Sequence, residues 1–242
     1  LISIVLALSL TLTAFGSFIG SDIDNRSEGY GGGYEVIMET SLGLEGSNID
    51  PEGLEDIDVI PILSYGKEGG TCSNINAVYP PRIIGLPDIL IDENGFKLKG
   101  TTDDISDLSG IREKLNSRIP IVVDENTLTW IYFGEVGTIF EIEPLPGYQI
   151  ELVVVGILEP SVLTGTFVMS EEHLEEIYPS SSTYDLFLAT GKKKDEIIPE
   201  LEMHFQDLGP EVDLVEDRAR EEMEYELAYL SLFRDYLILG VI

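Results

Sequence analysis

Residues 119–189 decide the fold, and they read IPIVVDENTLTWIYFGEVGTIFEIEPLPGYQIELVVVGILEPSVLTGTFVMSEEHLEEIYPSSSTYDLFLA. The stretch opens with a β-branched run that predicts a strand, and a helical turn follows at residues 127–133. Alternation over residues 138–143 predicts a second strand, with Ile139 and Glu141 on one face and Phe140 and Ile142 on the other. After a turn, the apolar centre of residues 149–158 predicts a strand that is covered on both faces. The stretch therefore predicts a compact sheet that serves as a scaffold, not a set of catalytic loops.

The composition limits the class of protein. The chain has 242 residues, with 45 acidic against 14 basic side chains and a formal charge of -31. So strong a negative balance argues against nucleic acid and anionic lipid surfaces as partners. Disorder is disfavoured because 43% of the residues are hydrophobic. The single cysteine, Cys72, excludes an intrachain disulfide and a thiolate metal cluster, and we expect it to be a small buried residue.

Both ends of the chain are apolar. Residues 1–20 contain no charge and no proline, and as a helix they would span roughly 30 Å, the thickness of a bilayer core. A cleaved signal peptide is the alternative, but the run lacks a basic leader, which favours a transmembrane helix. Residues 21–33 end in three glycines and predict a flexible exit from the membrane. Residues 236–242 predict the start of a second membrane helix. Residues 21–233 are thus expected outside the cytoplasm of a multi-pass plasma-membrane protein.

Two strand–helix–strand units bracket the chain, at residues 34–65 and 184–215. Two such units that pair into one sheet form a split βαβ plait. We therefore predict an α+β fold in which residues 34–82 and 184–216 form a discontinuous plait. Residues 83–183 would be a subdomain inserted into it.

Helical signals occur at five places. Residues 217–242 have apolar positions along one side and no break signal, which predicts a stalk helix that runs into the second membrane segment. Apolar residues at helical spacing predict a helix over 106–117. Asp50 and the proline after it predict the start of a short helix. Residues 170–178 and 192–207 predict two further helices.

The search for chemistry is mostly negative. The chain contains no GxxxxGK[ST], GxGxxG or GxSxG motif, so nothing indicates a phosphate loop or a nucleophile elbow. His173 and His204 have no second ligand at helical spacing, which excludes the HExxH type of zinc site, and we expect both on helix surfaces. Trp130 is expected in the core rather than as a platform for a ligand. We predict no catalytic, cofactor-binding or metal-binding residue and no cofactor.

Acidic clusters carry little information in this chain. Asp103 and Asp104 are adjacent, but adjacency means little among 45 acidic residues. Calcium at Asp22 and Asp24 is conceivable, although a solvated charged loop is favoured.

One ordered set of loose motifs covers nearly the whole chain. It comprises Cys72–Asn76, Pro81–Gly85, the strand at 119–123, Gly-x-x-Gly-Thr-x-Phe-x-Ile at 134–142, the strand after Gly147, and Phe167–Ser170 with Tyr178 and Pro179. In their order, and with apolar segments at both ends, these motifs resemble the extracytoplasmic domain of FtsX-like, MacB-type ABC transporter permeases. The resemblance implies a porter-like plait with an inserted, mostly β, sabre-like subdomain, flanked by membrane and stalk helices.

The resemblance also implies a function. Such permeases are noncatalytic, act as dimers, contact membrane lipid at both ends of the domain and depend on a separate cytoplasmic ABC ATPase subunit. Closure of the ATPase moves the membrane helices, and stalk helices relay the motion outward. For this chain the implied role is export, release of lipoprotein or lipid, or regulation of the envelope by mechanotransmission, with residues 217–242 as the relay.

Two other classes stay open. An extracellular ligand-sensing domain of a membrane receptor would also lie between two spans. Sequence beyond Ile242 distinguishes them, because further spans indicate a permease and a signalling module indicates a receptor. An enzyme of the envelope is disfavoured by the empty motif search.

Overall fold

The computed structural model describes residues 10–11, 29–47, 54, 56–66, 81–102, 105–191 and 194–239. Most of the predicted first membrane helix lies outside the described residues. So do the predicted helix start and several residues singled out above, namely Asp22, Asp24, Asp50, Cys72, Asp103 and Asp104.

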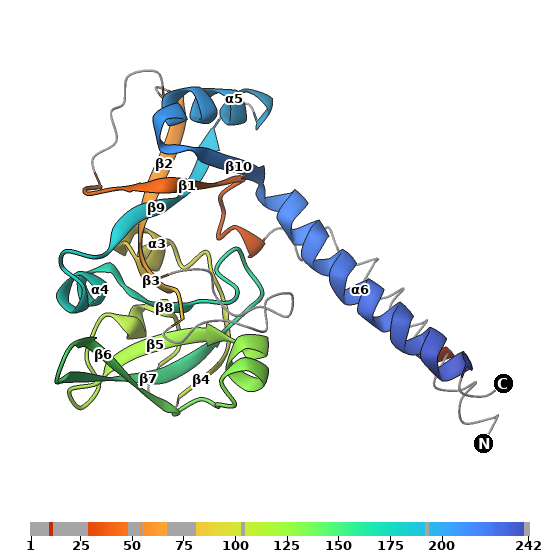
Figure 1. Ribbon diagram of the computed structural model, residues 1–242, viewed down its shortest axis with the longest axis horizontal. Coiled ribbons are helices and arrows are strands. Elements are labelled where there is room, and N and C mark those ends of the chain that lie inside the picture. Colours follow the sequence, from red (N-terminus) through yellow and green to blue (C-terminus); the bar gives the residue numbers. More distant parts are fainter. Residues whose placement is uncertain are drawn as a thin grey trace.

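A compact body and one projecting helix make up the described chain (Figure 1). A ten-stranded mixed sheet runs through the body, and a few helices cover it, so the fold is α+β as predicted. The projecting helix is α6 (Val215–Leu239). It begins two residues before residue 217, where the stalk was predicted to start. Among the described residues, none of the helices combines the length and the apolar character needed to cross a bilayer.

Four strands from the two ends of the chain form the upper part of the sheet. They are β1 (Val36–Leu44), β2 (Ile57–Tyr65), β9 (Thr183–Gly191) and β10 (Pro210–Leu214), and α5 (Lys194–His204) links the last two. Their order is β10-β1-β9-β2 and every neighbouring pair is antiparallel. Within these four strands the first strand of each unit lies in the centre and the second outside it, which confirms the strand order of the predicted split βαβ plait. The helix predicted for the first unit lies outside the described residues.

The middle of the chain supplies the other strands. They are β3 (Ile83–Leu86), β4 (Leu98–Thr101), β5 (Ile119–Asp124), β6 (Ile139–Leu145), β7 (Tyr148–Leu158) and β8 (Phe167–Ser170). They continue the sheet from β2 in the order β3-β8-β5-β7-β4, and β6 pairs with β7. β3 pairs with β8, and β5 with β7, in parallel, while the other neighbours are antiparallel.

Short helices occupy the connections between these strands. They are α3 (Asp88–Glu93), the 3-10 turns η1 (Leu108–Ile111) and η3 (Gln206–Leu208), the π-helical turn η2 (Thr127–Ile131) and α4 (Glu171–Ile177). The predicted cap of α4 is present, because the Ser170 hydroxyl accepts a hydrogen bond from the backbone N–H of His173 at 3.4 Å.

The helix predicted over residues 106–117 is wrong except for η1. The carboxylate of Asp107 accepts a hydrogen bond from the Ser109 N–H at 2.9 Å and closes a local turn. Residues 115–118 then form a tight hairpin whose two central residues have φ values of 50° and 69°. Because residues with left-handed φ cannot continue a right-handed helix, the apolar spacing here serves a folded loop instead.

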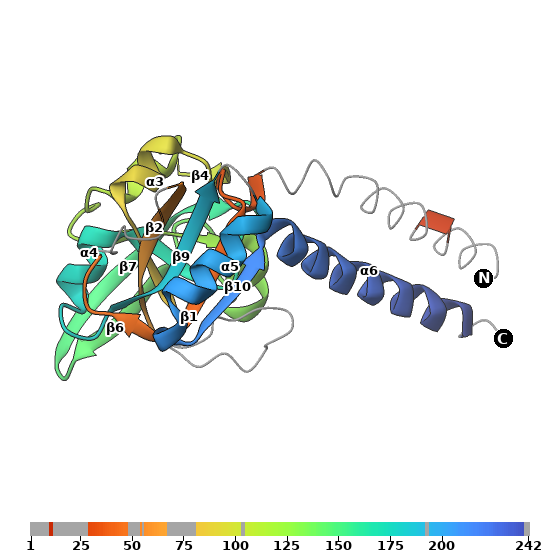
Figure 2. The ribbon, with the colours of Figure 1, turned by 90° about the horizontal axis from the view of Figure 1, so that it is seen from above.

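Two apolar layers cover the plait. Successive residues of a strand point to opposite faces, so β1 and β9 each feed both layers. On one face Met38 and Phe187 pack with Phe205 at the end of α5, which lies across the plait strands in Figure 2. On the other face Ile37 and Leu188 join the apolar cluster that contains the start of α6. The plait is thus held between α5 and the root of the projecting helix.

Candidate coupling site at the root of the long helix

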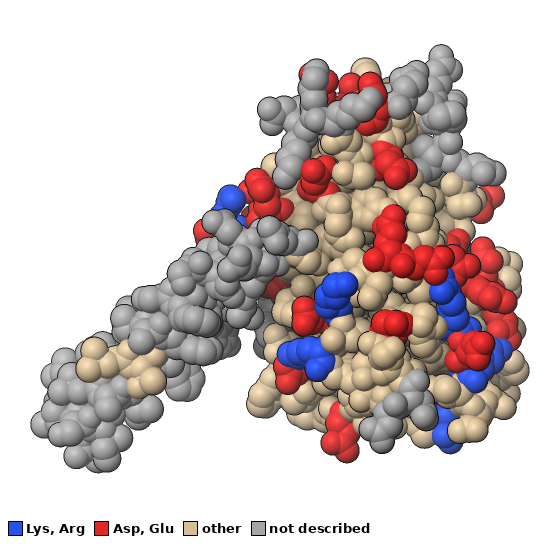
Figure 3. Space-filling view, turned by 180° about the vertical axis from the view of Figure 1, so that it is seen from behind, with Lys and Arg blue, Asp and Glu red and all other residues tan. Residues whose placement is uncertain are grey.

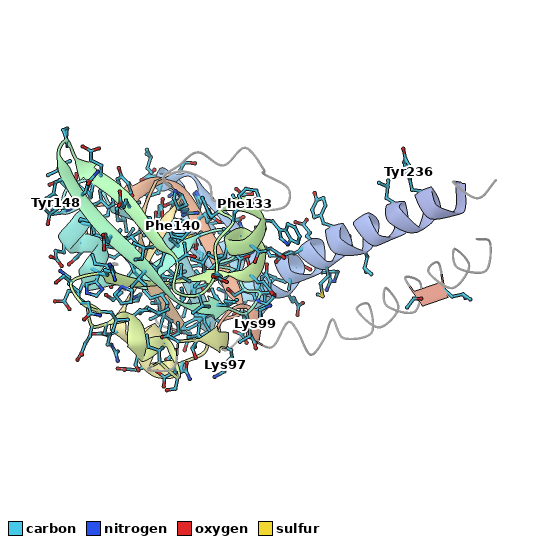
Figure 4. The ribbon with its side chains drawn as sticks, turned by 90° about the horizontal axis from the view of Figure 1, so that it is seen from below. Lys97, Lys99, Phe133, Phe140, Tyr148 and Tyr236 are labelled. Atoms are coloured by element: carbon cyan, nitrogen blue, oxygen red, sulfur yellow. The ribbon has the colours of Figure 1, made fainter. Side chains whose placement is uncertain are left out.

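The first turns of α6 are built into the core. Val215, Ala219 and Met223 are 3%, 1% and 6% exposed, and their spacing of four residues places them on one stripe of the helix. The N–H of Val215 also donates to the carbonyl of Glu35 at 2.9 Å, which joins the helix start to the residue before β1. Farther along, Tyr236 is 78% exposed, and Figure 4 shows it projecting from the far part of the helix. The helix is therefore fixed at one end and free of the body at the other.

A chain of ion pairs joins the same root to three strands. Arg218 of α6 donates to Glu39 of β1 at 2.8 Å and to Asp213 of β10 at 2.9 Å. The second carboxylate oxygen of Glu39 accepts from Arg82 at 3.0 Å. Arg82, which immediately precedes β3, donates in turn to Asp185 of β9 at 3.1 Å. Any displacement of the root thus acts directly on β1 and β10 and, through Glu39 and Arg82, on β9.

Glu39 is the centre of this network. Partial burial raises its pKa, but the neighbouring guanidinium groups of Arg82 and Arg218 outweigh that effect and hold the pKa below its ordinary value. The pKa of Arg218 is raised, because its bonds to Glu39 and Asp213 outweigh the effect of burial. Glu39 and Arg218 are therefore both charged at neutral pH.

We predict that Glu39→Gln lowers the free energy of unfolding by about 1–2 kcal/mol at pH 7, since it removes one charged partner from two arginines. The folded-state pKa of Glu39 lies below the ordinary value of 4.5. The stabilisation is therefore complete above that value and is lost as the pH falls through the folded-state pKa. Urea unfolding from pH 7 to pH 3 should show a smaller acid loss in the variant than in the wild type.

Glu211→Gln is the matched control. Glu211 is the exposed residue of β10 that pairs across from Glu39, so its change should alter stability by less than about 0.5 kcal/mol. Equal losses in the two variants would show that the ion pairs at Glu39 add nothing beyond general surface charge.

The N-terminal approach to the plait packs against the same root. The hydroxyl of Tyr30 donates to Glu222 of α6. Gly31 is buried, and a Cβ placed there would lie 2.8 Å from a methyl carbon of Val215. The prediction of a flexible glycine exit is thus wrong for Gly31, which packs against Val215 of α6, and for Gly32, where a Cβ would lie 2.7 Å from the ring of Phe96. Glycine is used there because the backbone approaches its neighbours too closely for a side chain.

A polar cleft lies in the part of the body built from the middle strands. Its volume is about 420 Å³, and the hairpin of residues 115–118, the β6–β7 hairpin and α4 enclose it. Four of the lining side chains form two ion pairs, Lys114 with Glu176 at 2.6 Å and Arg118 with Glu151 at 2.5 Å. The lining is mostly charged or polar, so the cleft is suited to a polar ligand rather than an apolar one.

Both histidines were predicted on helix surfaces, but His173 is buried and His204 is half-buried. His173 is only 4% exposed, so its placement on a helix surface is wrong. It follows the cap of α4 by three residues and is buried, as are Leu174 and Ile177 of the same helix. Burial, with a smaller effect from the charge of Lys114, lowers the pKa of His173 below its ordinary value. His204 is half-buried and lies edge-on to the ring of Phe205, with 4.8 Å between ring centres.

The prediction that Trp130 lies in the core is also wrong, because its side chain is 68% exposed. In the π-helical turn Thr127 and Leu128 occupy the buried positions and leave Trp130 outside. Within the described ranges, no three histidine, cysteine or acidic side chains come together in a way that could hold a metal ion.

Sequence reasoning missed the ion-pair network entirely. Its partners are far apart in the chain, 179 residues for Arg218 and Glu39 and 103 for Arg82 and Asp185. One usable signal exists. Glu39 interrupts a buried strand and Arg82 immediately precedes another, and charged residues at such positions need partners.

No protein-family model and no curated protein matches the chain. Among solved structures it is similar to the periplasmic region of MacB from Actinobacillus actinomycetemcomitans, with 13% identity over 80% of this chain and 94% of that one, at a TM-score of 0.39. It is also similar to the extracellular domain of the noncanonic ABC-type transporter YknZ from Gram-positive bacteria, with 9% identity over 74% and 98%, at a TM-score of 0.33. The chain is thus similar to the extracytoplasmic region of MacB, the protein after which the family resembled by its sequence motifs is named.

Proposed function

We propose that the chain is the extracytoplasmic domain of an ABC transporter permease subunit and that it transmits motion rather than catalysing a reaction. A separate cytoplasmic ATPase would supply the energy, and a second permease copy would complete the dimer. The work done would be export, release of lipoprotein or lipid, or regulation of the envelope. The ordered sequence motifs and the apolar segments at both ends of the chain support this proposal.

The proposal includes a division of the chain. Residues 34–82 and 184–216 form the porter-like plait, residues 83–183 the inserted sabre-like subdomain, and residues 217–242 the stalk. The grouping of strands supports it, because the four plait strands all come from the two ends of the chain and the other six from its middle.

The anchorage of α6 is the observation that carries the proposal. A helix of 25 residues spans about 37 Å and is stiff over that length. Its root is held by a backbone bond, by three buried side chains and by the two ion pairs of Arg218. A tilt imposed at the far end must therefore displace β1 and β10 with it.

The test is a two-residue Gly-Pro insertion after Glu224, beyond the buried stripe and before the apolar end of α6. Proline removes a helix hydrogen bond and clashes with the preceding turn, so the insertion breaks the lever without unfolding the body. In the complete permease with its ATPase, reconstituted in vesicles, we expect transport to fall at least about tenfold while ATP binding stays unchanged.

The matched control places the same insertion between Pro146 and Gly147, in the turn between β6 and β7. That turn lies away from α6, so transport should survive (Figure 1). Transport that persists in the Glu224 insertion would refute the relay.

A second candidate function is a ligand-sensing domain of a membrane receptor, and the polar cleft favours it. Arg118 and Glu151 face each other across the cleft wall and would take a zwitterionic or charged ligand. Retention of a small polar metabolite from a cell extract by the wild-type chain, lost in Arg118→Ala, would support this function.

A further inference from the structure

The π-helical turn η2 is held firmly on the body. The buried carboxylate of Asp124 accepts hydrogen bonds from the N–H of Thr127 at 3.0 Å and from the N–H of Gly165 at 2.8 Å. At the other end of the turn, the N–H of Gly134 donates to the carbonyl of Leu128 at 2.8 Å. The turn is thus fixed at both ends, and the side chains it presents have defined directions.

Two aromatic side chains of this segment point outward. Trp130 is 68% exposed and Phe133 is 85% exposed. Between them Tyr132 turns inward, and its ring centre lies 5.1 Å from that of Phe167 and 5.8 Å from that of Phe140. The segment therefore divides its aromatic residues between the core and the surface.

Exposure of Phe133 is accompanied by an unfavourable backbone conformation. Its φ is 51°, in the left-handed region. A bulky residue is disfavoured there, because its Cβ crowds the following carbonyl. Asparagine or glycine would relieve the strain, and both would also remove the apolar ring. A strained, exposed aromatic residue is a marker of functional contact.

The location of this segment indicates what it contacts. In Figure 1 η2 lies in the lower part of the body, on the side toward which the far end of α6 projects, and Figure 4 shows Phe133, Lys97 and Lys99 on that side. We name Trp130, Phe133, Lys97 and Lys99 the aromatic edge. The far end of α6 leads into the apolar residues 236–242. In the proposed function these residues enter the membrane, so the aromatic edge is on the side that faces it.

The charge of this edge suits a lipid surface. The segments that form it, residues 95–101 and 125–138, hold two lysines and two glutamates, so their formal charges cancel in a chain of charge -31. Lys99 is paired with Glu125. The Lys and Arg side chains of the opposite view also lie mostly over this lower half of the body (Figure 3). These two segments therefore bring no net negative charge to a membrane surface, unlike the chain as a whole.

We propose that the aromatic edge rests on the outer lipid surface, with Trp130 and Phe133 inserted among the headgroups. This inference rests on the proposed function, because the ends of the chain must hold the domain at the membrane. Tryptophan favours the membrane–water interface, where its ring is buried and its N–H remains hydrated. The contact would fix the inserted subdomain while α6 moves the plait.

The test uses the only tryptophan of the chain as its probe. The 242-residue chain is reconstituted in vesicles of zwitterionic phosphatidylcholine, some of them brominated near the headgroup end of the acyl chains. Interfacial side chains reach about 5–10 Å into the headgroup boundary, so we expect Trp130 emission to shift to the blue and to fall by about half. The quenching should not need anionic lipid, since the edge is neutral.

Phe133→Asn is the informative variant. Asparagine accepts the left-handed conformation, so the variant should melt at the same temperature as the wild type or higher. It should nevertheless lose most of the lipid quenching, because without the Phe133 ring the contact loses one of its two apolar anchors and the indole of Trp130 no longer stays inserted. Leu145→Ser is the control, since Leu145 is also exposed, at 65%, but lies on the β6–β7 hairpin. It should leave the quenching unchanged.

The outcomes separate the two proposals. A chain that floats with the vesicles but shows no quenching of Trp130 would overturn the lipid contact and leave the proposed function standing. A chain that does not float with vesicles at all would overturn both. A blue shift that grows with protein concentration in the absence of lipid would identify a second copy as the occupant and refute the lipid contact.

Discussion

Phe187→Ala is expected to lower the free energy of unfolding by about 3–5 kcal/mol, a large part of the stability of a single domain. Phe187 lies in β9, between β1 and β2, and its side chain is fully buried. Its ring centre lies 5.2 Å from that of Phe205, at the end of α5. Truncation removes a ring from the layer between the plait and α5 and leaves a cavity that two strands and a helix cannot close without breaking their pairing.

Urea unfolding followed by far-ultraviolet circular dichroism measures this loss. Fluorescence emission of Trp130 is less suitable, because this side chain is exposed to solvent in both the folded and the unfolded state. Phe133→Ala is the control with the same chemistry, and since Phe133 is 85% exposed it should change stability by less than about 0.5 kcal/mol. A loss below about 1 kcal/mol for Phe187→Ala would mean that α5 does not pack on the plait as the structure has it.

Strands were predictable where one period dominates the sequence. Alternation over residues 138–143 placed Phe140 and Ile142 on one face and Ile139 on the other. In β6 Ile142 is 3% exposed and Ile139 is 41% exposed, so the assignment of faces is confirmed. All six residues of β5 are buried, as its unbroken apolar run indicates. In such segments local preference and tertiary burial agree, and the sequence is sufficient.

Prediction failed where apolar residues serve a loop instead of a regular element. Leu108, Ile111 and Leu115 have helical spacing, but a local Asp107 bond and a left-handed hairpin fold them into a turn. At Trp130 the error has another source, since the π-helical turn adds a residue and shifts which side chains face inward. Neither effect has a periodic signature, so neither could be read from spacing alone.

The coupling site was beyond sequence reasoning for a different reason. The ion pairs of Glu39 with Arg218 and Arg82 join residues that only the tertiary fold brings together, because the sheet order places β1 between β9 and β10. The plait was predicted, but its register was not, and neither was the docking of α6 that brings Arg218 to Glu39. Side-chain pairing across a sheet is a tertiary property that local patterns do not encode.

Gly31→Ala is expected to lower the free energy of unfolding by about 2–3 kcal/mol. An added Cβ would lie 2.3 Å from the carbonyl oxygen of Tyr34 and 2.8 Å from a methyl carbon of Val215. The nearer atom belongs to the backbone and cannot rotate away, so the turn that leads into β1 must shift. That shift also strains the backbone bond from Val215 to Glu35, which starts α6. The loss should therefore appear at the helix root as well as in global stability.

Gly29→Ala is the control two residues away, since a Cβ at Gly29 meets nothing within 4 Å. Its stability should stay within about 0.5 kcal/mol of the wild type. Amide hydrogen exchange locates the effect of Gly31→Ala, because protection of residues 215–223 should fall more than that of β5 and β7. If Gly31→Ala and Gly29→Ala prove equally harmless, the approach to β1 is not packed against α6, and the anchorage of the lever rests on the Arg218 ion pairs and the buried stripe alone.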